Sequence, residues 1–123
     1  MTHKLLLVDD SGLARRSMRA ILEPAGYHVV EAEDGMTALE RYYLEKPDVV
    51  ILDLVMKGMY GLDVLTKLRE LDPAARVIIV SADVQRSSRE LVEAAGAAGF
   101  INKPVDGPGV LNLLRGLLER TAS

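Results

Sequence analysis

Short apolar runs alternate along this chain with longer stretches in which apolar residues recur every three or four positions. The runs are too short for helices and rich in Val, Ile and Leu, which is typical of strands buried on both faces of a parallel sheet. The longer stretches have the spacing of amphipathic helices. Strands are predicted at Lys4–Val8, Tyr27–Val30, Val49–Leu52, Arg76–Val80 and Phe100–Asn102.

Polar residues, glycines and prolines mark the ends of the predicted helices. Ser11 and Asp83 are the expected N-caps of the first and fourth helices, and Gly26 is the expected stop of the first. Pro24 is expected to distort only the last turn before that stop. Helices are predicted at residues 12–25, 35–45, about 62–71, 84–95 and 106–120. Their expected inward side chains include Ala25, Tyr43 and Leu91.

Five strands and five helices in strict alternation predict an α/β fold with helices on both faces of a parallel sheet. A flavodoxin-like, doubly wound sheet with strand order 2-1-3-4-5 is the topology expected for a chain this short. The 123 residues, 49% of them hydrophobic, are enough for one domain with its own core. We therefore expect residues 1–123 to form a single domain without an output domain.

Polar residues stand where four of the predicted strands end. Asp9 and Asp10 follow the first strand, Asp53 the third, Ser81 the fourth and Lys103 the fifth. In the predicted order the first and third strands are neighbours, and ligands of open parallel sheets bind beyond the carboxyl ends of the strands. The three acids should therefore lie together, with the hydroxyl and the lysine on the other side of Asp53.

Three ionised carboxylates at close range repel one another, and an unneutralised cluster would raise at least one pKa. A hard divalent cation with oxygen ligands offsets that charge, so the pattern favours Mg²⁺, with Mn²⁺ as a substitute. The chain has no cysteine and only His3 and His28, which are far apart, so softer metals are poorly served. With a cation and Lys103 nearby, Asp53 has the setting of an attacking carboxylate in aspartyl-phosphate chemistry.

The net charge and the hydropathy of the sequence argue against two classes of binding partner, nucleic acids and membranes. The net charge is −3 and no basic run is present, which argues against direct nucleic-acid binding. No apolar segment reaches the length needed to span a membrane, so we expect no membrane partner and a cytoplasmic location.

Four motifs follow one another over essentially the whole chain. They are Leu6–Ser11 with Arg15-Arg16, Val50–Met56 with Gly61, Ser81-Ala82, and Gly96-Ala97 through Phe100 to Lys103-Pro104. In their order and spacing these motifs resemble the receiver domain of two-component response regulators, in form nearest to the stand-alone, CheY-like chemotaxis type.

The resemblance implies that Asp53 accepts a phosphoryl group from a sensor histidine kinase or a histidine phosphotransfer protein. It implies direct Mg²⁺ ligands at Asp10, Asp53 and the backbone carbonyl of Val55, with Asp9 acting mainly through water. Lys103 and Ser81 match the family's lysine and hydroxyl residues, which contact the phosphoryl oxygens.

A coupled movement is also implied. Ser81 shifts toward the phosphoryl group, Phe100 turns inward as the switch aromatic, and the surface of the fourth helix, fifth strand and fifth helix changes. That surface would bind a downstream protein target, the protein being a monomer or a dimer promoted by phosphorylation.

Four positions near the expected site depart from the family pattern or belong to its variable set. Lys57 stands where a proline is usual and Tyr60 where an acid is usual. Val55 and Asp83 occupy variable positions that tune how readily water reaches the acyl phosphate. Apolar Val55 offers no group that would orient water.

Other functions of the same fold meet specific objections. A Mg²⁺-dependent, phosphatase-like enzyme with an aspartyl nucleophile needs a second acid close behind it, but Leu54-Val55 follow Asp53. An electron-transfer flavoprotein needs a phosphate cradle after the first strand, where Asp9-Asp10 would repel phosphate. A degenerate receiver that binds without phosphorylation would not need the intact residue set.

Overall fold

The computed structural model describes residues 2–56, 59–82 and 85–121. Within these ranges a parallel sheet contains five strands. They are β1 (Lys4–Val8), β2 (His28–Ala32), β3 (Val49–Asp53), β6 (Val77–Ser81) and β7 (Gly99–Asn102). Their order across the sheet is β2-β1-β3-β6-β7. Numbered along the chain as members of this sheet, the strands follow the predicted order 2-1-3-4-5, with β2 at an edge.

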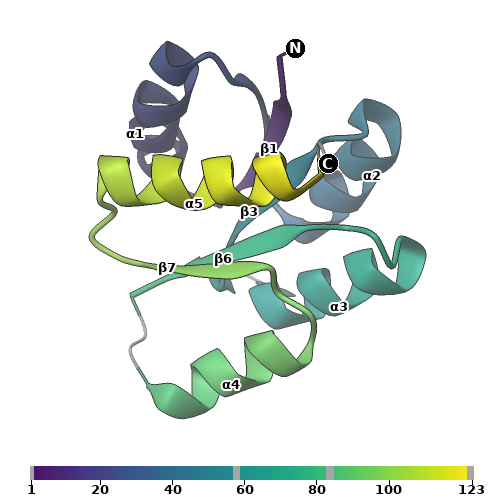
Figure 1. Ribbon diagram of the computed structural model, residues 1–123. Coiled ribbons are helices and arrows are strands. Elements are labelled where there is room, and N and C mark those ends of the chain that lie inside the picture. The colour runs from purple at the N-terminus through teal and green to yellow at the C-terminus, as the bar shows by residue number, and fades with distance from the viewer. Residues whose placement is uncertain (1, 57–58, 83–84, 122–123) are drawn as a thin grey trace.

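Helices cover both faces of this sheet, as predicted. The α-helices of the described segments are α1 (Gly12–Leu22), α2 (Gly35–Glu45), α3 (Gly61–Leu71), α4 (Arg86–Ala94) and α5 (Gly107–Thr121). Figure 1 shows α1 and α5 together on one face, with α3 and α4 on the other. The residues packed against each face place α2 with α3 and α4. The fold is therefore the flavodoxin-like, doubly wound arrangement.

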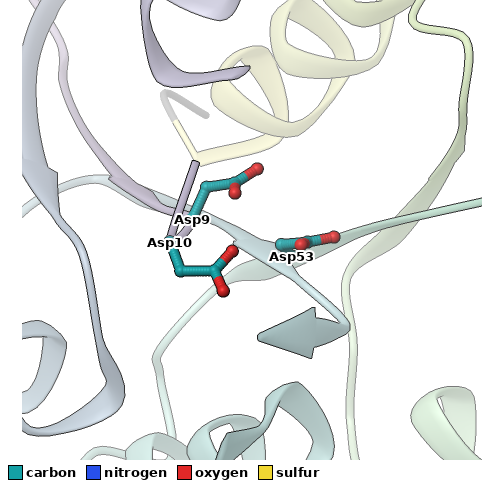
Figure 2. A group of neighbouring side chains, drawn as sticks. All are labelled: Asp9, Asp10 and Asp53. Carbon is teal, nitrogen blue, oxygen red and sulfur yellow. The ribbon is translucent and has the colours of Figure 1, made fainter. Parts of the chain in front are cut away.

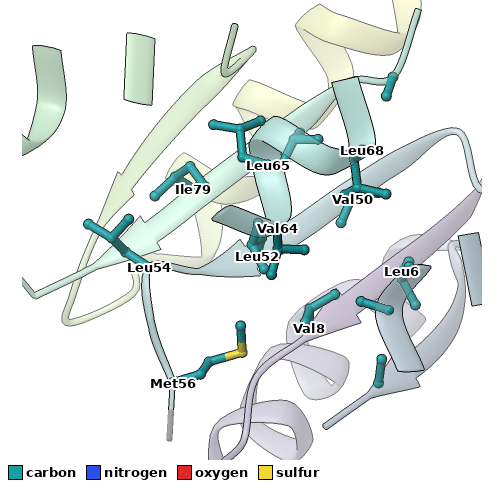
Figure 3. Packing of buried hydrophobic residues seen from close by; sticks show 14 of the residues in the cluster. Leu6, Val8, Val50, Leu52, Leu54, Met56, Val64, Leu65, Leu68 and Ile79 are labelled. Carbon is teal, nitrogen blue, oxygen red and sulfur yellow. The ribbon is translucent and has the colours of Figure 1, made fainter. Parts of the chain in front are cut away.

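The central strand separates two apolar clusters. All five residues of β3 are buried, and successive side chains point to opposite faces. Val50 and Leu52 belong to the cluster under α2, α3 and α4, whereas Val49 and Ile51 belong to the cluster under α1 and α5. Figure 3 shows the first cluster, where β3 packs against α3 through the labelled residues Val50, Leu52, Val64, Leu65 and Leu68.

The strand register aligns the carboxyl ends of the central strands. Val8 of β1 lies beside Leu52 of β3, and Leu52 lies beside Ile79 of β6. These strands therefore end at the same edge of the sheet. This alignment places Asp9, which follows β1, next to Asp53, the last residue of β3.

Helix α1 begins and ends as the local sequence predicts. The Ser11 hydroxyl accepts a hydrogen bond from the Ala14 N–H at 3.1 Å. Beyond Leu22 the last turn tightens into a 3₁₀ helix at Glu23–Ala25 that contains Pro24, and Gly26 ends it with a φ of 98°. Proline has no N–H for the α-helical pattern, which explains the tightened turn.

Three side chains predicted to face inward are exposed instead. Ala25 lies in the 3₁₀ turn, where the helical phase has changed. Tyr43 is 79% exposed because its neighbour Tyr42 takes the inward position and donates to Asp72 Oδ2 at 2.6 Å. Leu91 is 53% exposed because Val92 takes the buried position beside it in α4.

Strand β2 begins one residue and ends two residues later than predicted, and two further regions also differ from the prediction. The expected loop after β3 contains a short antiparallel hairpin, β4 (Val55–Met56) and β5 (Met59–Tyr60). The predicted N-cap Asp83 lies outside the described residues, as do Val84 and Lys57. Helix α4 is described from Arg86, and Gln85 at its N-cap position makes no side-chain capping bond. Among the described helices, none combines the length and apolar character needed to cross a membrane.

Replacing a central core residue tests this packing. Leu52 is fully buried in β3, so Leu52→Ala should lower the free energy of unfolding by about 3 kcal/mol through lost burial and a cavity. Leu44→Ala, an exposed position of α2, should change it by less than about 0.5 kcal/mol. Urea unfolding followed by circular dichroism measures both. Equal effects of the two substitutions would contradict the placement of β3 at the centre.

Candidate functional site

Three carboxylates converge at the carboxyl edge of the sheet. Asp9 and Asp10 follow β1, and Asp53 is the last residue of β3. One oxygen from each lies within 4.8 Å of the others (Figure 2). Asp53 is only 8% exposed, whereas Asp10 faces solvent. The structure thus brings together the three acids that the strand pattern predicts as neighbours.

Lys103 joins this group from the opposite side. Its Nζ lies 3.4 Å from Asp53 Oδ1 and 3.9 Å from Asp9 Oδ2. The backbone N–H of Lys103 donates to the Ser81 carbonyl at 2.9 Å, which ties the end of β7 to the end of β6. Ser81 is 2% exposed and ends β6, one residue beyond the partner of Asp53 in the sheet register. The predicted lysine and hydroxyl therefore lie at the same edge as the acids.

Burial is the main influence on the charge state of Asp53. The loss of water around its carboxylate raises the pKa of Asp53, and the negative charge of Asp9 raises it further. Lys103 opposes this increase, but the pKa stays above its ordinary value. An ionised Asp53 is therefore held at a cost in folding free energy, which a cation at this site would reduce.

Gly61 allows the chain after β5 to pass against the backbone of Asp53. A Cβ atom at Gly61 would lie 2.4 Å from the Asp53 carbonyl oxygen and 2.8 Å from Leu54 Cα, which no side chain tolerates. The Gly61 N–H also donates to the Leu54 carbonyl at 2.6 Å. Gly61 belongs to the motifs that resemble the receiver family. The close approach of its backbone to Asp53 and Leu54 explains why glycine is needed there.

Asp9 is held by three hydrogen bonds. Its N–H donates to the Ala32 carbonyl at 3.2 Å, and its Oδ1 accepts from the Ser11 N–H at 2.9 Å. Its carbonyl accepts from Arg15 Nη1 at 2.5 Å. The position of Arg15 beside Asp9 could not be predicted, because nothing in the sequence separates Arg15 from the adjacent Arg16.

The remaining predicted residues flank this centre. Val55 lies two residues beyond Asp53 with its side chain exposed, and a role for its carbonyl as a ligand stays a prediction. Phe100 lies in β7 and is partly buried. The guanidinium carbon of Arg89 in α4 stands 5.3 Å from the centre of the Phe100 ring, a cation–π distance.

The donor set fits a hard divalent ion. The gathered groups are carboxylate oxygens, which Mg²⁺ prefers and Mn²⁺ also accepts. The exposed carboxylate of Asp10 leaves one side open to water, and Mg²⁺ usually retains several waters. The residues present therefore suit Mg²⁺ on chemical grounds.

A protein-family model matches most of the chain. The model of the response regulator receiver domain matches residues 5–115. The chain belongs to this family. The matched range includes all the site residues, from Asp9 to Lys103.

Relatives and solved structures agree with this assignment. The chemotaxis protein CheY of Bacillus subtilis is 38% identical over 120 residues, covering 97% of this chain and 100% of that protein. CheY of Thermotoga maritima is 38% identical over 117 residues, covering 93% and 96%. The crystal structure of a CheX–CheY–BeF₃–Mg²⁺ complex from Borrelia burgdorferi matches with a TM-score of 0.90 and 31% identity, covering 94% of this chain and 89% of that one. The predicted resemblance to CheY-like receivers of two-component systems is thus confirmed.

The raised pKa of Asp53 has a consequence for stability. A carboxyl group whose pKa is raised by folding contributes stability below its unfolded-state pKa and loses it as the pH rises through the folded value. Without divalent metal at pH 7, Asp53→Asn should therefore raise the free energy of unfolding, because it removes a charge that burial and Asp9 disfavour. The gain should shrink as the pH falls toward about 3.9, the ordinary pKa of an aspartyl group, because the wild type then increasingly binds a proton in both the folded and the unfolded state.

Glu40→Gln is the control, because it removes one exposed carboxylate of α2. It should leave the stability near that of the wild type. Urea unfolding in EDTA across this pH range measures all three proteins. A destabilised Asp53→Asn at pH 7 would show that the ionised form of Asp53 is favoured by folding, contrary to its burial.

Proposed function

We propose that this receiver domain is a phosphorylation-dependent switch in which Asp53 is the phosphoacceptor. The phosphoryl group comes from a phosphohistidine of a sensor histidine kinase or of a histidine phosphotransfer protein. The observation that carries the proposal is a largely buried carboxylate, Asp53, with a lysine amine 3.4 Å away and two further carboxylates within 4.8 Å. A structural ion pair would need one acid, and this site gathers three.

The proposed transfer moves one phosphoryl group between two protein side chains. An oxygen of Asp53 forms a bond to phosphorus as the bond between phosphorus and the imidazole nitrogen breaks, and the electron pair of that bond stays on the imidazole. The ammonium of Lys103 stabilises charge on the phosphoryl oxygens, and the hydroxyl of Ser81 donates to one of them. The product is an acyl phosphate on Asp53.

A divalent cation is part of the proposal. Asp10, Asp53 and the carbonyl of Val55 would hold Mg²⁺ directly, and Asp9 would act mainly through water. When bound, Mg²⁺ supplies positive charge that offsets the charge on the phosphoryl oxygens. One solved relative, the Borrelia burgdorferi complex, was crystallised with Mg²⁺.

Phosphorylation would act on a surface away from the acids. The new group adds charge and acceptor oxygens beside Ser81, which shifts toward it. Phe100 then turns inward, and the surface formed by α4, β7 and α5 changes. The proposed output is binding of a downstream protein to this surface, by a monomer or by a dimer that phosphorylation promotes.

The proposed function also implies a domain organisation, partners and a cellular location. All residues that the phosphoryl step uses lie within residues 5–115, which the receiver-domain model matches, so a single receiver domain is sufficient for that step. The expected partners are the phosphodonor protein and the downstream target, in the cytoplasm, without direct contact to nucleic acid or membrane. Two matched relatives are named chemotaxis proteins, which makes motility control the first pathway to test.

Chemical phosphorylation tests the acceptor directly. Incubation with MgCl₂ and phosphoramidate should add one base-labile phosphate to each chain, detected as one phosphoryl mass increment by intact-mass spectrometry. Asp53→Asn should abolish it, and EDTA should reduce it strongly. Asp63→Asn, which alters an exposed acid of α3, is the control and should keep it.

Two outcomes would contradict the proposal. Undiminished labelling of Asp53→Asn would show that the acceptor is another residue. Sustained release of phosphate from a phosphomonoester over many turnovers would favour the alternative of a Mg²⁺-dependent, phosphatase-like enzyme with an aspartyl nucleophile.

The contact between Arg89 and Phe100 makes the switch measurable. Phe100 is the single phenylalanine of the sequence, so 4-fluorophenylalanine labelling gives one ¹⁹F resonance. Phosphorylation should shift that resonance. Because an exposed cation–π contact contributes about 0.5–1 kcal/mol, Arg89→Gln should increase the ratio of inward to outward rings by about two- to five-fold and move the resonance toward its phosphorylated position.

Arg86→Gln is the matched control, because Arg86 is also an exposed arginine of α4 paired with a glutamate four residues later. It should leave the resonance unchanged. A ¹⁹F resonance that does not respond to phosphorylation would exclude Phe100 as a switch residue.

A further inference from the structure

One arginine of α1 is turned toward the acid cluster. The side chain of Arg15 is only 18% exposed, whereas the adjacent Arg16 lies at the surface. Arg15 Nη1 donates to the Asp9 carbonyl at 2.5 Å, and Arg15 Nε donates to Glu31 Oε1 at 2.7 Å. The guanidinium therefore bridges the loop after β1 and the side of β2.

The acceptor on β2 is itself held in place. Glu31 Oε2 accepts a hydrogen bond from Arg19 Nη1, and Arg19 Nη2 also pairs with Glu23 Oε2 at 3.0 Å. The hydrogen bonds from Arg19 and Arg15 lower the pKa of Glu31, so Glu31 stays ionised at neutral pH. In the sheet register Glu31 lies beside Leu7, two residues before Asp9. Arg15 is thus anchored to a part of the sheet next to the acids.

The hydrogen bond to Asp9 acts on the geometry of Asp10 as well. The Asp9 carbonyl belongs to the peptide plane that carries the N–H of Asp10, so fixing this oxygen fixes the direction in which Asp10 leaves the strand. The N–H of Asp9 is held by Ala32 and its carboxylate by the Ser11 N–H. With the carbonyl also held, little backbone rotation remains at Asp9.

We propose that Arg15, anchored on Glu31, is a positioning residue of the metal site. It holds the Asp9–Asp10 peptide so that both carboxylates face Asp53. Its effect is geometric, because the charge of Glu31 balances the charge of Arg15 at 2.7 Å. This inference rests on the proposed function, in which Asp10 and Asp53 bind the cation.

Affinity for Mn²⁺ measures this role without any phosphoryl transfer. Titration followed by electron paramagnetic resonance of free Mn²⁺ gives the Kd of the full chain. Residues that orient metal ligands typically change metal affinity by 10- to 100-fold, so Arg15→Met should raise the Kd at least about ten-fold. Arg16→Met removes the same charge from the same helix and should leave the Kd within about two-fold.

Conservative variants separate positioning from simple charge. Arg15→Lys keeps the charge but lacks the planar fork that reaches two acceptors, so its Kd should lie between those of the wild type and Arg15→Met. Glu31→Gln removes the ionised anchor and should also raise the Kd. The double variant Arg15→Met/Glu31→Gln should bind about as weakly as Arg15→Met alone, because the two residues act as one unit.

A merely structural role has a different signature. It would lower the thermal midpoint of Arg15→Met in EDTA while the folded protein kept the wild-type Kd, and this result would overturn the inference. If Arg15→Met does not fold, Arg15→Lys and Glu31→Gln decide the matter, and wild-type Kd values for both would overturn it.

Asp10→Asn distinguishes failure of the inference from failure of the proposed function. A wild-type Kd for Asp10→Asn would contradict the proposed metal site itself. Weak binding by Asp10→Asn together with a wild-type Kd for Arg15→Met would leave the proposed function in place and reject only the role of Arg15.

Discussion

Repulsion among Asp9, Asp10 and Asp53 is the force against which the rest of this structure is built. One oxygen of each carboxylate lies within 4.8 Å of the others, and Asp53 is largely buried, so water offers it little screening. The sheet register brings the acids together. Burial of the apolar residues on both sides of β3 supplies the free energy that holds the acids in place against their repulsion. The unbalanced negative charge at this site favours the binding of a cation.

Support for the cluster comes from the end of β7, from the start of α3 and from α1. Lys103 at the end of β7 lies within 4 Å of two of the acids. Gly61 lets the chain before α3 pass against the Asp53 carbonyl. Arg15 reaches from α1 to the Asp9 carbonyl. These contacts act on backbone atoms or on charge, and together they fix the direction of carboxylates that would otherwise move apart.

The parts of the fold that sequence predicted correctly follow from long-range rules. Apolar runs such as that of β3 are unambiguous, and the rule for carboxyl ends of parallel strands brought Asp9, Asp53 and Lys103 together. The inward faces of the helices were predicted less well. Where two apolar residues are adjacent, as at Tyr42 and Tyr43, the spacing does not show which of them faces the core. The β4–β5 hairpin has strands of two residues, too short for any periodicity. The choice of Arg15 over its neighbour depends on Glu31, which lies in another strand.

The central claim is that the fold holds an excess of negative charge at one point, which a divalent cation relieves. The most direct measurement is the free energy of urea unfolding in MgCl₂ compared with NaCl of equal ionic strength. A gain specific to Mg²⁺ is expected, about 2.7 kcal/mol at a free concentration one hundred times the Kd, and no such gain is expected in Asp10→Asn. Equal stabilisation of the wild type by the two salts would contradict the binding of a divalent cation by these acids.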